Sequence, residues 1–405
     1  MDHVMKAVKG GITAVPGFLA SGVHSGIKKI NEPDLALIFS KNPCTAAGLF
    51  TTNRVAAAPV RLTQEHIRSG RLQAIVANSG NANACTGSQG EAAAREMTER
   101  VARYLGFAPE LVAVASTGVI GEPFPLEAFR TGIPKLVKTL NGQGSRSAAR
   151  AIMTTDTKPK EAAVRFKIGK GWVTVGGIAK GSGMIHPNMA TMLAFLTTDL
   201  SIEPFLLRTM LTSAANRSFN MITVDGDTST NDTVICLANG RAGNPDLKRS
   251  ESARLKFQTA LDAVCLQLAR MIVQDGEGAT KLIEIHVRGA VDPEGAKTIA
   301  MRVANSNLVK TAFFGADANW GRIMAAIGAA GVELDPSRID IFFNHAPMVR
   351  NGTGLGKAAE RKAARVLKKP FFVLTIELHT GTASATAWTC DLSDEYIRIN
   401  TAYRS

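Results

Sequence analysis

Apolar positions fall into short runs and helical stripes that alternate along the whole chain. Apolar runs bounded by Gly, Pro, Asn and Ser predict buried strands, and apolar residues three or four positions apart predict amphipathic helices. Helices are predicted over 91–105, 204–216, 252–273, 308–314, 320–327 and 356–367. Strands are predicted over 35–40, 72–77, 111–115, 164–168, 172–178, 192–196, 233–237, 283–287, 339–343, 371–378 and 383–389. This alternation predicts an α/β (α+β) protein.

Composition narrows the class of protein. Hydrophobic residues make up 45% and charged residues 20%, as in an ordinary globular protein. Neither an export signal nor a membrane-spanning run is evident, so we expect a cytoplasmic protein. The five cysteines are scattered without CxxC spacing, which predicts free thiols. The net charge of +13 is dispersed and suits small anionic substrates at least as well as nucleic acid.

The stretch from residue 180 to residue 196 changes character abruptly at Thr191. Upstream, Gly-Ser-Gly and His-Pro-Asn favour turns, and downstream an apolar run predicts a buried strand. A hydroxyl held at such a junction can attack the carbonyl carbon of Ala190, just before it. We hypothesise that Thr191 cuts the chain there and then serves as an N-terminal nucleophile. An ordinary threonine at the start of a strand is the alternative.

Two further polar segments suggest parts of a site. Thr117-Gly118 at a predicted strand end offer a hydroxyl and an unhindered N–H, the two donors that an oxyanion hole needs. An ordinary exit from strand to turn is the alternative that the pattern alone favours. Residues 151–160, which include Thr154, either bind a polar substrate or form a solvated turn. The amide-rich residues 78–87 are predicted to form a loop.

Several other chemistries are poorly matched. Asp225-Gly-Asp227 resembles the start of a calcium loop, but the twelfth position is Cys236 instead of an acid. The chain has no Gly-x-Ser-x-Gly elbow and no His, Cys and acid cluster with metal-ligand spacing. P-loop and dinucleotide fingerprints are also missing. The sequence therefore predicts no bound metal and no nucleotide cofactor.

Motifs along the full length resemble the ornithine acetyltransferase (glutamate N-acetyltransferase) family of arginine biosynthesis. The matching stretches are 11–18, 77–87, 116–121, 180–198, 224–233, 274–281, 306–323 and 400–405. The resemblance implies a layered αββα-type sandwich of the self-cleaving ornithine acetyltransferase/aminopeptidase type, with a second, smaller α/β domain. It places the catalytic domain at residues 1–280 and the smaller domain, with a tail returning to the active site, at 281–405. Cleavage at Ala190-Thr191 would give an α segment, 1–190, and a β segment, 191–405.

The resemblance also implies a reaction. Thr191 would take the acetyl group from N-acetyl-L-ornithine, with Thr117 and Gly118 as the oxyanion hole, and L-glutamate would then receive it. The new α-amine of Thr191, with a pKa of roughly 8, would act as the base for the Thr191 hydroxyl. No cofactor is implied, although acetyl-CoA is an alternative acetyl donor.

Substrate contacts and assembly are further implications of the resemblance. The implied substrate-binding residues are Thr154, Lys180, Thr191, Glu277, Asn400 and Ser405. The two segments would stay together as an α2β2 heterotetramer, with no nucleic acid and no membrane as partner. Two alternatives remain: a self-cleaving amidase or aminopeptidase that passes its acyl group to water, and a non-enzymatic basic binding protein.

Overall fold

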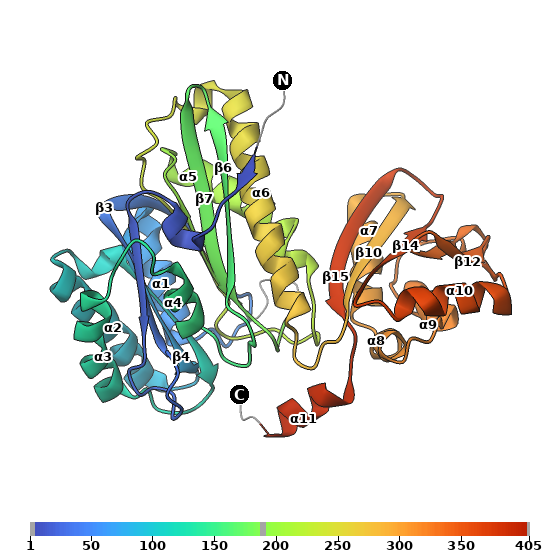
Figure 1. The fold of residues 1–405 in the computed structure, drawn as a ribbon, viewed down its shortest axis with the longest axis horizontal. Helices are drawn as coiled ribbons and strands as arrows, with labels where there is room; N and C mark the ends of the chain where they lie inside the picture. The colour runs from blue at the N-terminus through green and yellow to red at the C-terminus, as the bar shows by residue number, and fades with distance from the viewer. Residues whose placement is uncertain (1–4, 187–191, 403–405) are drawn as a thin grey trace.

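A computed structural model gives the fold, and it describes residues 5–186 and 192–402. The strands of the first 280 residues build one nine-stranded sheet (Figure 1). Its first half contains β2 (Phe18–Val23), β3 (Leu35–Phe50), β4 (Arg71–Asn81) and β5 (Val112–Val119). Its second half contains β1 (Lys6–Ala7), β6 (Lys160–Ile168), β7 (Gly171–Lys180), β8 (Leu193–Thr198) and β9 (Thr233–Ala238).

The long strand β3 joins the two halves. Its first part pairs with β4, from Leu35 opposite Asn78, and its last part pairs with β9, up to Phe50 opposite Thr233. The register with β4 shifts between Phe39 and Cys44, in a stretch that contains Pro43. Proline cannot donate a ladder hydrogen bond, so this is where the strand is free to bend. The bend lets the two halves of the sheet face each other.

Alternating side chains fill the space between the two halves. Ile38 and Ile75 of the first half share a buried cluster with Ile178, Phe195 and Ile235 of the second half. The neighbours Leu37 and Val76 point the other way and pack in a separate cluster, as the period of two in a strand requires. The short helix α4 (Ser145–Ala151) also contributes to the inner cluster.

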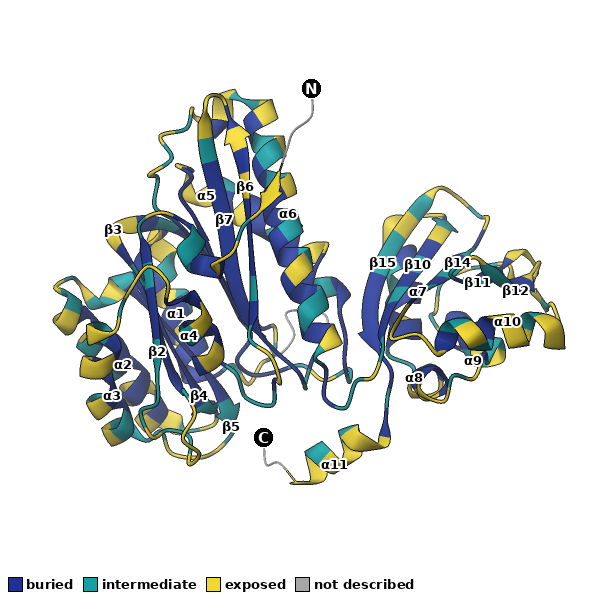
Figure 2. Ribbon diagram, in the orientation of Figure 1, coloured by how far each residue is buried: buried dark blue, intermediate teal, exposed yellow. Residues whose placement is uncertain are grey.

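Helices cover both outer faces. The first half is covered by α1 (Ala58–His66), α2 (Gly87–Leu105) and α3 (Leu126–Lys138). The second half is covered by α5 (Pro204–Asn216) and α6 (Glu251–Gln274). The layers therefore run helix, sheet, sheet, helix, which confirms the predicted sandwich. Figure 2 shows the strands buried between helices whose outer faces are exposed.

The rest of the chain forms a second, six-stranded sheet and the helices packed on it. Its strands are β10 (Leu282–Ala290), β11 (Asp340–Phe343), β12 (Ala346–Arg350), β13 (Thr353–Gly354), β14 (Phe371–Glu377) and β15 (Ala383–Cys390). Its helices are α7 (Pro293–Ala304), α8 (Asn307–Phe314), α9 (Trp320–Gly328) and α10 (Lys357–Leu367). The last helix, α11 (Asp394–Ala402), extends away from this sheet toward the sandwich (Figure 1).

The predicted elements correspond to observed ones, with three kinds of difference. The predicted loop over 78–87 was wrong at its start, because Asn78–Asn81 continue strand β4 and pair with β5. Helices α1, α3, α4, α7 and α11 were not predicted. Strands β1, β2, β12 and β13 were not predicted either. Among the described residues, no helix has the length and apolar character needed to cross a membrane.

Candidate active site

A cleft of about 70 Å³ opens where the ends of β5 and β7, the loop before β6 and the turn after α6 come together. Six of the predicted site residues line it. They are Thr117, Gly118, Thr154, Lys180, Glu277 and Asn400. The other predicted residues, Ala190, Thr191 and Ser405, lie outside the described residues. Sequence positions separated by nearly three hundred residues therefore meet at one place.

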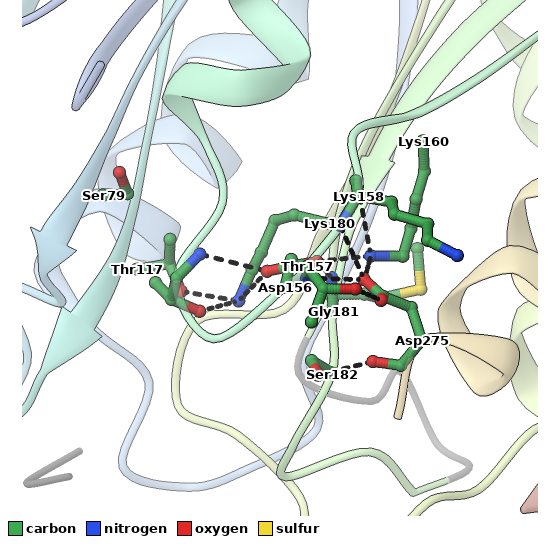
Figure 3. Close-up of polar contacts among 12 residues, drawn as sticks. Ser79, Thr117, Asp156, Thr157, Lys158, Lys160, Lys180, Gly181, Ser182 and Asp275 are labelled. Carbon is green, nitrogen blue, oxygen red and sulfur yellow. Dashed lines mark hydrogen bonds and ion pairs between the residues drawn. The ribbon is translucent and has the colours of Figure 1, made fainter. Parts of the chain in front are cut away.

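Lys180 is the central cation of this cleft. It is the last residue of β7, and its side chain is only 3% exposed. Its ammonium donates to the Thr154 hydroxyl at 2.8 Å and to the Thr117 hydroxyl at 3.3 Å, as Figure 3 shows for Thr117. Burial lowers the pKa of Lys180, while the nearby Asp156 carboxylate, 3.9 Å away, opposes that shift. A buried ammonium ringed by hydroxyls can bind a substrate carboxylate.

Thr117 and Gly118 lie together near the end of β5. Gly118 has a φ of 132°, and a Cβ built there would approach the Gly80 carbonyl carbon to 2.4 Å. Only glycine fits this close approach between β4 and β5. Thr117 is 5% exposed, and both residues reach the cleft surface. Their pairing at a strand end, predicted from sequence, is thus present at the cleft.

Glu277 supplies the anionic side of the cleft. It lies on the turn after α6, and its carboxylate accepts a hydrogen bond from the Asn400 amide at 2.8 Å. A Cβ on Gly183 would come within 2.5 Å of this carboxyl group, so the glycine makes room for it. Asn400 belongs to α11, which thereby reaches the cleft from the second sheet. Tyr396 of the same helix donates to Asp225 at 3.3 Å.

The segment before β9 forms a wall that sequence reasoning missed. Ser229, Thr230 and Asn231 line the cleft. The Asn231 amide donates to the backbone oxygens of Ala82 and Ser116 at 2.6 and 2.9 Å, which ties this wall to β5. The cluster of hydroxyl and amide residues over 227–233 was the available signal, but no role in the site was predicted for it.

Asp232 follows this wall and is fully buried. One of its carboxylate oxygens accepts the backbone N–H of Met192 at 3.0 Å. Burial raises the pKa of Asp232 well above its usual range, although the Met192 N–H and Lys180 oppose the shift. The Asp232 carboxyl group therefore holds the backbone of Met192, the first described residue after Thr191.

Residues 151–160 are not the solvated turn that one interpretation offered. Asp156 and Lys160 are 0% and 2% exposed at their side chains, and Thr154 lines the cleft. No group of three or more His, Cys, Asp or Glu side chains in the described part of the chain is arranged to hold a metal ion.

The fold and the cleft define an enzyme of the αββα-sandwich class, with a buried cation and a carboxylate facing one polar cavity. Comparison with known sequences places it further: the chain belongs to the ArgJ family, whose model matches residues 19–405.

Relatives match over essentially the whole chain. The arginine biosynthesis bifunctional protein ArgJ of Symbiobacterium thermophilum is 52% identical over 403 residues, covering 99% of this chain and 100% of the relative. The protein of the same name from Geobacter sulfurreducens is 51% identical, covering 96% and 100%. A crystal structure of the arginine biosynthesis bifunctional protein ArgJ from Bacillus halodurans aligns with a TM-score of 0.50 at 42% identity, covering 52% of this chain and 98% of that chain.

Proposed function

We propose that this protein is an acetyltransferase of arginine biosynthesis that moves the acetyl group of N-acetyl-L-ornithine to L-glutamate. Its membership of the ArgJ family and the names of its relatives support the pathway and the enzyme class. The single observation in the structure that carries the proposal is the cleft, which sets the Lys180 ammonium and the Glu277 carboxylate beside the Thr117-Gly118 pair. N-acetylornithine carries the opposite charges, a carboxylate and a side-chain ammonium.

The proposed reaction is a two-step transfer through Thr191. Its hydroxyl oxygen attacks the acetyl carbonyl carbon, its own α-amine accepts the hydroxyl proton, and Thr117 and Gly118 stabilise the negative oxygen that forms. The bond from the carbonyl carbon to the α-nitrogen breaks, and L-ornithine leaves with the proton. The L-glutamate amine then attacks the acetyl-Thr191 ester, and N-acetyl-L-glutamate is released.

Substrate binding divides between the two sides of the cleft. Lys180, next to Thr154, pairs with the substrate carboxylate, and Glu277, oriented by Asn400, pairs with the ornithine ammonium. Ser405 completes this set of contacts in the proposal. The reaction itself needs no cofactor or metal. The word bifunctional in the relatives' names supports acetyl-CoA as a second acetyl donor.

Self-cleavage between Ala190 and Thr191 creates the nucleophile in this proposal. The Bacillus halodurans chain supports it, because 98% of that chain accounts for only 52% of this one. A segment spanning 191–405 would likewise be slightly more than half of this protein. Two α and two β segments assemble in the proposed cytoplasmic α2β2 heterotetramer.

Denaturing electrophoresis with N-terminal sequencing, followed by an acetyl-transfer assay, tests the proposal. The wild type should give two pieces, the second beginning Thr-Met-Leu-Ala, and should transfer labelled acetyl from N-acetylornithine to glutamate. Thr191→Ala should remain whole and inactive. A single intact chain with full transferase activity would contradict the mechanism. A self-cleaving amidase or aminopeptidase would instead release acetate at a rate that glutamate does not increase.

A further inference from the structure

Lys160 lies at the centre of a buried ion cluster just behind the cleft. Its ammonium is 2.6 Å from an Asp156 oxygen and 2.6 Å from an Asp275 oxygen, and its side chain is 2% exposed (Figure 3). None of the three lines the cleft. Removing charges from water is costly, so a buried pair is retained only with close hydrogen-bonded geometry. Two carboxylates at 2.6 Å meet that condition.

On one side, the cluster holds the segment that carries Lys180. Asp156 accepts the backbone N–H of Gly181 at 2.7 Å and that of Thr154 at 3.0 Å. These are the residue after Lys180 and the residue whose hydroxyl contacts its ammonium. Burial alone would raise the pKa of Asp156, but the ammonium groups of Lys160 and Lys180 outweigh it and keep the carboxyl ionised.

On the other side, the cluster holds the turn that carries Glu277. Asp275 lies two residues before Glu277 and also accepts the Thr157 N–H at 3.0 Å and the Thr157 hydroxyl. Its backbone oxygen accepts the Ser182 hydroxyl at 2.6 Å, and the Glu277 N–H donates to the Ser182 oxygen at 3.0 Å. The turn is therefore fixed on one side to the loop before β6 and on the other to the residues after Lys180.

We propose that the Lys160–Asp275 ion pair is a positioning bridge that sets the spacing between Lys180 and Glu277, and thereby the length of the diamino acid that the cleft accepts. The bridge also links a residue before the proposed cleavage point to one after it. Loss of the bridge frees the 275–277 turn to move relative to Lys180, so the two charges no longer match ornithine. This inference rests on the proposed acetyl transfer for its kinetic readout.

Three variants and one control test the bridge. Asp275→Asn removes the charge at Asp275, Lys160→Met removes the shared cation, and the double variant removes both partners. Thr157→Val is a milder change, because it deletes only the hydroxyl that supports Asp275. The matched control is Lys248→Met, since the Lys248–Glu203 pair has the same 2.6 Å separation but is 58% and 54% exposed. The donors are N-acetylornithine and the homologue with one methylene fewer in its side chain.

The expected result separates positioning from general damage. Asp275→Asn should raise KM for N-acetylornithine about tenfold with a smaller fall in kcat, and should reduce the preference for ornithine over its shorter homologue about tenfold. Thr157→Val should change KM and the donor preference in the same direction, but by less than Asp275→Asn does. The double variant should lose little more than the worse single variant, because both changes break the same Lys160–Asp275 pair. Lys248→Met should behave as wild type.

Two results would overturn the bridge. One is an unchanged preference between the two donors in Asp275→Asn and Thr157→Val protein that is fully folded and cleaved. The other is a crystal structure of Asp275→Asn in which the Lys180 Nζ to Glu277 carboxyl distance equals that of the wild type. The crystallographic test stands even if the wild type shows no transferase activity, an outcome that would count against the proposed function alone.

Discussion

Gly118 shows how one missing side chain allows the cleft edge to form. Its positive φ and its contact with the Gly80 carbonyl carbon leave no room for a Cβ. We expect Gly118→Ala to destabilise the protein by about 3 kcal/mol, from strain and overpacking together. Acetyl transfer should fall even in the folded fraction, because β5 must shift. Thermal unfolding and a transferase assay measure the two effects.

Gly142→Ala is the matched control, because a Cβ there meets nothing within 4 Å and the residue has no positive φ. It should leave both stability and activity close to those of the wild type. If Gly118→Ala were equally harmless, the close approach of β4 and β5 at the cleft would be wrong.

The buried position of Lys180 predicts that activity falls at alkaline pH. Burial lowers its pKa from 10.5, so it loses its proton at a lower pH than a surface lysine. In the proposed function, the charged form binds the substrate carboxylate. Binding should therefore be strong below this pKa and weaken as pH rises through it. A pH profile of kcat/KM should show this descending limb. Lys180→Met should lower kcat/KM about 100-fold and remove the limb. A profile that stays flat up to pH 10.5 would contradict this role.

At the scale of elements, an acid holds α2 and α3 together. Glu96 of α2 accepts hydrogen bonds from Arg130 of α3 at 2.7 Å and from Arg100 at 2.6 Å. The Arg130 guanidinium contributes most to lowering the pKa of Glu96, which falls to about 2. Because the folded-state pKa is depressed, this stabilisation is present above the unfolded-state pKa of about 4.3 and is lost as pH falls toward 2.

Glu96→Gln should therefore flatten the decline of thermal stability between about pH 4.5 and pH 2.5, while lowering stability modestly near neutral pH, where the pair is partly exposed. Thermal unfolding followed over that pH range checks this. Glu127→Gln is the control, since Glu127 is 77% exposed and bonds Arg130 only at 3.4 Å. An acid dependence equally steep in Glu96→Gln and wild type would contradict the assignment.

Elements whose apolar residues recur at a regular spacing were predictable from sequence. Elements defined by long-range contacts were not. The helix over 252–273 corresponds to α6 within a residue at each end, because its apolar stripe is long and regular. Asn78–Asn81 were expected to form a loop, since asparagine and glycine favour turns, but pairing with β5 extends the strand through them. Helix α11 has no buried residues, so no apolar stripe marked it.

The candidate site shows the same division. The Thr117-Gly118 pair, Lys180 and Glu277 were found through motifs, and their meeting in one cleft follows from the fold. Lys160 and Asp275 were beyond reach, because nothing local indicates that a Lys-Pro-Lys turn and an acid more than a hundred residues away form a buried pair. Such a contact depends on how α6 packs against β6 and β7.

At the scale of the whole molecule, strands from the two sides of the junction interleave. Strand β8 pairs with β7, and β9 lies between β8 and β3, so the sheet order crosses the junction twice. The inner core likewise mixes Ile75 and Ile178 with Phe195 and Ile235. The two segments of the proposed cleavage would therefore be held by a shared sheet and a shared core instead of a docking surface.

Cleaved protein should therefore migrate as one species in size-exclusion chromatography, even at high salt, because apolar burial and ladder hydrogen bonds resist salt screening. The segments should separate only across the same denaturant range in which circular dichroism reports loss of the sheet. Separation in salt alone, with the sheet signal intact, would contradict the interleaved arrangement. The uncleaved Thr191→Ala protein is the control for elution volume.

The interleaved sheet also bears on how such a protein can be encoded. A polypeptide ending at residue 190 would leave β7 and the far end of β3 without their neighbours β8 and β9, exposing backbone groups and apolar faces that promote aggregation. Two separate genes for the two segments would thus yield chains unable to fold before meeting. A single gene whose product is divided only after folding avoids this difficulty. Under the proposed mechanism, the peptide bond at the junction therefore serves biosynthesis before it is removed for catalysis.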